Sequence, residues 1–113
     1  MERFDDWRKN IRKEKIKMSL DRIGDWEKFS IQVKKHVEQY TIPQYQNDDD
    51  ESDQVGIWSF EDCIKAIIKY TSRVGKGARG SVEAQRDLLK IAHYAQFAYN
   101  KFVTLYNLKD IYK

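Results

Sequence analysis

The sequence predicts an all-α protein, arranged as a compact bundle of about four helices with a long acidic loop. Apolar residues recur three and four positions apart through most of the chain, which is the spacing of one helical face. The 113 residues include one proline and five glycines, so long helices meet few interruptions. The length suits a single domain, 1–113, made of an N-terminal helical pair at 1–40, an acidic loop at 41–57 and a C-terminal helical hairpin at 58–113.

The N-terminal pair begins with an amphipathic helix predicted at 3–19, whose other positions are mostly charged. Its apolar positions are Phe4, Trp7, Ile11 and Met18. Gly24 breaks the pattern, and Asp25 is a suitable N-cap for a second helix at 25–40. The apolar face of this second helix carries Trp26, Phe29, Val33, Val37 and Tyr40.

The segment at 41–57 is predicted to be a long exposed loop between the two halves of the chain. Pro43 cannot continue a helix, and the residue before a proline avoids the helical region. Five of the six residues at 48–53 are acidic, and Gly56 closes the segment. This composition is typical of a linker.

The C-terminal hairpin pairs helices predicted at 59–74 and 82–106. Ser59 is a natural N-cap for the first, and Asp62, three residues later, makes a near capping box. Ser81 is the expected N-cap of the second helix. Its alanines allow a close helix approach, and its main apolar stripe is Ala84, Leu88, Ile91, Ala95, Ala98, Phe102 and Leu105.

The reactive side chains favour a non-catalytic protein, with a Cys63–His93 dyad as the competing interpretation. Cys63 is the only cysteine, which excludes an internal disulfide. It lies on an apolar helical face, where Trp58 is placed to pack across to it, so we expect a buried, inert thiol. His36 and His93 are the only histidines and lie on different helices. We therefore predict no catalytic residue, metal or cofactor.

The chain is expected to be cytoplasmic. Its N-terminus lacks the apolar core of a signal peptide. No apolar run approaches the roughly 20 residues of a membrane span. A membrane partner is therefore not expected.

A glycine-rich segment at 73–85, "RVGKGARGSVEAQ", contains a literal G-x-G-x-x-G at Gly75, Gly77 and Gly80. A dinucleotide-binding fingerprint needs a strand before these glycines and a second strand beyond the following helix. Here both flanks are predicted to be helices, and the chain ends before a parallel sheet is possible. A P-loop is excluded because Gly-Lys-Ser/Thr is missing at the required spacing. We interpret the segment as a turn between two helices.

The strongest functional signal is a basic surface around this turn in a chain of net charge +3. Lys65, Lys69 and Arg73 are four residues apart and share one helical face, and the next helix offers its N-terminal N–H groups. We predict binding of a phosphate-bearing ligand, which would be a nucleotide, a nucleotide signal or nucleic acid; a merely solvated basic face is the competing interpretation. The candidate phosphate-binding residues are Lys65, Lys69, Arg73, Lys76, Arg79, Ser81, Arg86 and Lys90, with Tyr70 and Tyr94 as candidates for stacking on a base.

Two other functions are compatible with the sequence. The first is a protein–protein interaction module that inhibits a host or defence enzyme, and its candidate contacts are Trp7, Asp48, Asp49, Asp50, Glu51 and Asp53. The weaker one is a helical, MazG-like nucleotide pyrophosphohydrolase, because Glu83 and Asp87 lie four apart on one helical face. Aromatic residues make up 13% of the chain, so a homo-oligomer is also expected.

Two stretches, "IKAIIKYTSRVGKG" at 64–77 and "RDLLKIAHYAQF" at 86–97, carry a resemblance to a known family. The two stretches, in this order along the chain, resemble the SaV-like proteins. These are small helical proteins that are mostly phage-encoded and are loosely labelled nucleotide kinases. The turn is longer here, and the resemblance covers only about 60–100. It implies a phage accessory protein in the host cytoplasm, although no phosphate-transfer machinery is visible. The matching positions are Lys69, Tyr70, Arg73, Gly75, Lys76, Gly77, Asp87, Leu88, Lys90 and Tyr94.

Overall fold

The computed structural model describes residues 19–45, 54–77 and 79–112. These residues form helices and connecting turns with no strand among them, so the predicted all-α class is confirmed. The predicted helix at 3–19 lies outside the described residues except for Ser19, which is not helical. The acidic run at 48–53 also lies outside them.

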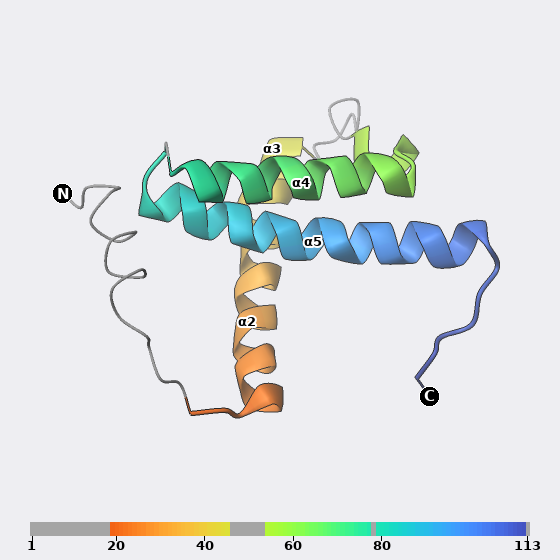
Figure 1. Cartoon of the computed structure of the whole chain (residues 1–113), viewed down its shortest axis with the longest axis horizontal. Coiled ribbons are helices and arrows are strands. Elements are labelled where there is room, and N and C mark those ends of the chain that lie inside the picture. The colour runs from red at the N-terminus through yellow and green to blue at the C-terminus, as the bar shows by residue number, and fades with distance from the viewer. Residues whose placement is uncertain (1–18, 46–53, 78, 113) are drawn as a thin grey trace.

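Two long helices make an antiparallel hairpin. α4 spans Phe60–Lys76 and α5 spans Ser81–Leu105, and they lie side by side along most of their length (Figure 1). α2, which spans Arg22–His36, crosses the hairpin at a steep angle and contacts α5. Within the described residues the arrangement is therefore a hairpin crossed by one helix, not a bundle of four.

The crossing helix starts earlier than predicted. Asp21, not Asp25, is the N-cap, because its Oδ1 accepts a hydrogen bond from the Gly24 N–H at 3.1 Å. Gly24 does not break the helix but permits this cap, since a Cβ there would collide with the Asp21 carboxylate. The prediction that Gly24 separates two helices is therefore wrong.

Pro43 does not end the helix either. α2 passes into a π-helical turn at Val37–Thr41 and continues as α3, Ile42–Tyr45. The Ile42 N–H bonds to the Val37 carbonyl five residues earlier. This wider turn lies where the proline ring would otherwise meet the carbonyl four residues before it. The start of the predicted loop at 41–57 is thus helical, and so is its end, a 3-10 turn at Gln54–Ile57.

The predicted cap of α4 is confirmed. The Asp62 N–H donates to Ser59 Oγ at 3.2 Å, and Asp62 Oδ2 accepts from the Ser59 N–H at 3.0 Å, so the capping box is complete. The Ser59 N–H and hydroxyl stabilise the Asp62 carboxylate and lower its pKa from the ordinary value. This cap fixes where α4 begins.

We expect Ser59→Ala to lower the free energy of unfolding by about 1 kcal/mol, because it leaves the Asp62 N–H without its acceptor. Urea denaturation followed by circular dichroism measures the change. Thr71→Ala is the control, since its exposed hydroxyl only donates to the Ile67 carbonyl of its own helix. That variant should stay within about 0.5 kcal/mol of the original protein. Equal losses in the two variants would contradict a specific role for the cap.

The glycine-rich segment forms the tight turn of the hairpin. α4 continues through Gly75 to Lys76 and ends at Gly77, whose φ of 73° is left-handed. Gly80, with φ of 90°, is the N-cap of α5, and Ser81 is its first helical residue. The expected N-cap role of Ser81 is therefore wrong. The interpretation of the segment as a helix–helix turn agrees with the structure.

Small side chains are buried in the contact between α4 and α5, beside the aromatic pairs Phe60–Phe102 and Tyr70–Tyr94. Cys63 is fully buried, and Ala66, Ala84 and Ala98 are each at most 7% exposed. Burial raises the pKa of the Cys63 thiol, which keeps it protonated and unreactive. Small residues on both helices permit the close approach that the sequence predicts.

The face of α5 turned toward α4 is rotated from the predicted stripe. Leu88 is 49% exposed and Leu105 is 63% exposed, whereas Asp87 is only 2% exposed. Steps of three and four residues from Ala84 lead to Asp87 as readily as to Leu88. Periodicity therefore identifies the helix but does not select which of the two faces is buried.

Candidate functional site

The predicted phosphate-binding residues fall into two groups according to their charge partners. Lys65, Lys69 and Arg73 line one face of α4, and none of them forms an ion pair with another described residue. Lys65 and Lys69 are exposed, and Arg73 is half-buried. We call these three residues the α4 cation row.

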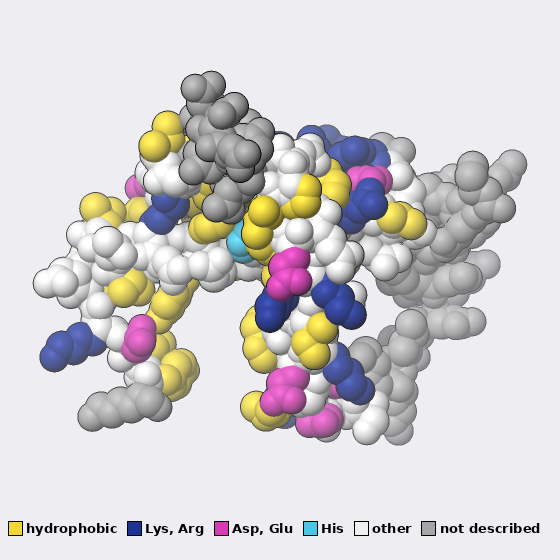
Figure 2. Space-filling model, turned by 180° about the vertical axis from the view of Figure 1, so that it is seen from behind, with side chains coloured by type: hydrophobic (Ala, Val, Ile, Leu, Met, Phe, Trp, Pro, Cys, Tyr) yellow, Lys and Arg dark blue, Asp and Glu magenta, His cyan; other side chains and the backbone are white. Residues whose placement is uncertain are grey.

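The cations of the turn and of α5 are paired. Glu83 contacts both Arg79, at 3.6 Å, and Arg86. Lys90 Nζ lies 3.7 Å from Asp87 Oδ1, and both side chains are largely buried. Figure 2 shows Lys and Arg side chains gathered near the α4–α5 turn with an acidic side chain among them. This second group therefore carries less net positive charge than its number of cations suggests.

The remaining two candidates lie at the two sides of the turn. Lys76 is the exposed last residue of α4, and Ser81 is the half-buried first residue of α5. The structure thus places Lys76, Arg79 and Ser81 at the turn, and the α4 cation row along the helix that leads to it.

Two tyrosines lie beneath the basic side chains. Lys69 Nζ and Lys90 Nζ lie 4.9 and 5.1 Å from the centre of the Tyr70 ring, and Arg73 lies 5.3 Å from it. Tyr40, from the π-helical turn, contacts Lys90 at 5.2 Å and also Arg86. These cation–π contacts hold the cations near the surface of the hairpin.

The aromatic rings form a short stack. Trp58 stacks on Tyr94 at 5.9 Å, and Tyr94 stacks on Tyr70 at 5.6 Å. Tyr94 therefore has a ring on each side, and Tyr70 is only 8% exposed. Base stacking on these two tyrosines stays a prediction that this packing does not favour. Trp58, the end of the stack, was not among the predicted site residues, because its position before the cap indicates a helix staple.

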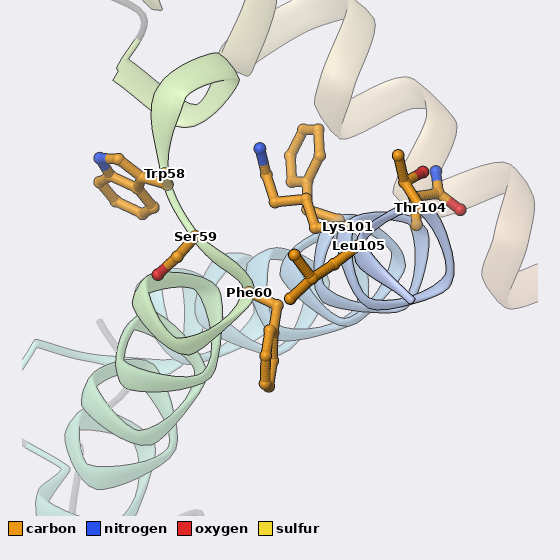
Figure 3. A pocket seen from close by; sticks show the side chains of 8 residues that line it. Trp58, Ser59, Phe60, Lys101, Thr104 and Leu105 are labelled. Carbon is orange, nitrogen blue, oxygen red and sulfur yellow. The ribbon is translucent and has the colours of Figure 1, made fainter. Parts of the chain in front are cut away.

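Two hollows lie on either side of Trp58. One, of about 350 Å³, is lined by Trp58, Asp62, Lys65, Ala66 and Lys69, and therefore includes two members of the α4 cation row. The other, of about 480 Å³, is shown in Figure 3 and is mainly apolar. Its one cation, Lys101, donates to the Gly56 carbonyl at 3.3 Å. The basic hollow is thus the better candidate for an anionic ligand.

His36 lies where α2 meets α5. It is 8% exposed, stacks on Tyr40 at 5.0 Å, and its Nε2 has no hydrogen-bond partner among the described residues. Burial lowers the pKa of His36, and the neighbouring charges of Lys90, His93 and Arg86 lower it further. His36 is therefore neutral at neutral pH in the folded protein.

We expect the protein to lose stability as the pH falls below about 6.5, the ordinary pKa of histidine. The unfolded chain binds a proton at His36 more readily than the folded chain does, so acid favours unfolding. The free energy of unfolding, measured by urea titration at several pH values, should fall through this range. His36→Gln should reduce that dependence, whereas His93→Gln should retain most of it, because burial is the main cause of the lowered pKa of His36. If both variants behaved alike, His36 would not be the responsible group.

The acidic residues of the described ranges do not assemble a metal site. Glu83 and Asp87 are engaged by cations, and no three His, Cys, Asp or Glu side chains cluster for a metal within the described ranges. The helices of the described part of the chain are also too short or too polar to cross a membrane. The partner-contact candidates Trp7, Asp48, Asp49, Asp50, Glu51 and Asp53 lie outside the described residues.

Comparison with protein-family models, curated proteins and solved structures finds no match to this chain. The resemblance of 60–100 to SaV-like proteins therefore stays a prediction. The described residues form an all-α fold in which basic side chains lie over tyrosine rings on a helical hairpin.

Proposed function

We propose that this protein is a non-catalytic binder of a phosphate-bearing ligand, which it holds on the face of α4. The observation that carries the proposal is the α4 cation row, because none of its three members forms an ion pair with another described residue. Asp62 lies near enough to Lys65 to be influenced by its charge, whereas no such effect links an acid to Lys69 or Arg73 among the described residues. Three positive charges on one face repel each other and favour an anion that lies across them.

The geometry of the row suits a chain of phosphates. Residues four apart on a helix are separated by about 6 Å along its axis, so the row extends over about 12 Å. Two of its members, Lys69 and Arg73, also contact the ring of Tyr70, which restrains their side chains. Restrained cations lose less conformational entropy when they bind a ligand than freely moving ones do.

The paired cations support this surface in a secondary role. Arg79 and Arg86 share Glu83, and Lys90 is engaged by Asp87, so each is partly neutralised. These three cations extend the positive potential around the turn, but their net contribution is less than three positive charges. The ligand is therefore expected to depend on the α4 cation row most strongly.

Binding measured as a function of salt tests the proposal. We expect a fluorescently labelled single-stranded oligonucleotide, ATP or inorganic tripolyphosphate to bind at low salt and to weaken steeply between about 50 and 200 mM salt. Isothermal titration calorimetry and fluorescence anisotropy measure the affinities. If none of these probes bound at low salt, the proposal would fail, and an interaction module that inhibits a host or defence enzyme would take its place.

A further inference from the structure

The hollow beside α4 has the composition of a nucleotide site. Its volume of about 350 Å³ lies at the small end of the range for ligand pockets, which is about 300–1,000 Å³. One part of its lining is aromatic, from Trp58, and one part is cationic, from Lys65 and Lys69. Ala66 leaves space between them, since its side chain is small. A ligand with a flat apolar part and an anionic part matches this lining.

Trp58 is held as a platform. It is half-buried, and one face of its indole lies against Tyr94 with an angle of 18° between the rings. Tyr94 is supported in turn by Tyr70 at 24°. The indole is the member of this stack that lines the hollow, so a flat base placed there would extend a row of rings that is already ordered. Stacking of this kind does not depend on the identity of the base.

The charges set a direction along the hollow. Asp62 lines one end, and its Oδ2 is occupied by the Ser59 N–H and hydroxyl. The carboxylate disfavours a phosphate at that end. Lys69 and then Arg73 follow toward the other end of α4 and favour one there. The apolar part of the ligand is therefore directed to Trp58 and the phosphates to Arg73.

We infer that this hollow receives the base of a nucleotide on Trp58, with the phosphates lying along Lys69 and Arg73. This inference rests on the proposed function and names the ligand class for the same surface. The nucleotide has two sources, a free nucleoside polyphosphate or one unit of a single-stranded nucleic acid. Both present the same base and phosphate chemistry to the hollow.

The experiment compares ATP, inorganic tripolyphosphate and a short single-stranded oligoadenylate on the full chain and on tryptophan variants. We expect ATP to bind more tightly than tripolyphosphate, and Trp58→Leu to weaken ATP by about 5- to 100-fold while tripolyphosphate is unchanged. Trp58→Phe keeps a ring and should lose less. Trp26→Leu, which alters a tryptophan 61% exposed on α2, is the matched control and should bind ATP as the original protein does.

The outcomes separate the inference from the proposed function. Absence of binding by all three probes at low salt overturns the proposed function and the inference with it. The inference alone is overturned by two results together. ATP and tripolyphosphate bind with equal affinity, and Trp58→Leu weakens binding of the oligoadenylate no more than it weakens binding of tripolyphosphate. If Trp58→Leu does not fold, the inference is tested by the affinity of Trp58→Phe for ATP and by the difference in affinity between ATP and tripolyphosphate in the original protein. If Trp58→Leu weakens binding of the oligoadenylate only, the ligand is a single-stranded nucleic acid. If Trp58→Leu weakens binding of ATP, the ligand is a free nucleotide.

Discussion

Replacing Lys65, Lys69 and Arg73 together by glutamine is expected to remove most of the affinity for a single-stranded oligonucleotide at low salt. Each phosphate neutralised on a single strand contributes about 0.7 to the slope of log affinity against log salt, so the triple variant should lose about 2 units of slope. The effect is large because none of these three side chains forms an ion pair with another described residue. Fluorescence anisotropy across a salt series measures both quantities.

A control for net charge is available on α2. Arg22, Lys28 and Lys35 are exposed and form no ion pair with another described residue. Replacing these three by glutamine removes the same total charge at residues that do not line the hollow. The control should change the slope much less than the α4 variant does. Equal changes would indicate that the ligand responds to overall charge and not to the α4 cation row.

The second large effect concerns the buried pair in α5. Asp87→Ala is expected to lower the free energy of unfolding by about 3 kcal/mol, because it leaves the Lys90 ammonium largely buried without its counter-charge. This is the low end of the usual range, since Lys90 keeps its contacts with the rings of Tyr40 and Tyr70. Urea denaturation at neutral pH gives the measurement.

Glu83→Ala is the matched control for this prediction. It also removes a carboxylate from α5, but its partners Arg79 and Arg86 are about half exposed, so its loss should cost no more than about 1 kcal/mol. The double variant Asp87→Leu with Lys90→Met should recover part of the stability, because no charge is then left buried. Similar losses of unfolding free energy in Asp87→Ala and Glu83→Ala would show that burial does not determine how much the Asp87–Lys90 ion pair contributes to stability.

Some features of the fold that depend on residues close together in the sequence were predicted correctly. The Ser59–Asp62 capping box and the glycine turn were predictable because each depends on residues within a few positions of one another. The two hairpin helices were predictable from periodicity together with segment length and the Ser59 cap. The start of α2 was not, because Asp21 and Asp25 are both acceptable caps and only the packed structure distinguishes them.

The site was predictable in composition but not in arrangement. The spacing of the α4 cation row indicates a shared face, yet the sequence does not show that Glu83 neutralises two other cations. It also does not show that Trp58 would stack on Tyr94, since the two residues are far apart in the chain and meet only through the hairpin. Long-range contacts of this kind depend on which face of α5 is buried, and periodicity leaves that choice open.

α2 contacts the hairpin mainly near its own C-terminal end. Lys90 contacts Tyr40 and Tyr70 at nearly equal distances, and His36 is buried beside them. The other end of α2 stands away from the hairpin in Figure 1, where Ile23 and Trp26 are mostly exposed. The described contacts therefore hold α2 to the hairpin near its C-terminal end, and the first turns of α2 leave Ile23 and Trp26 exposed to solvent.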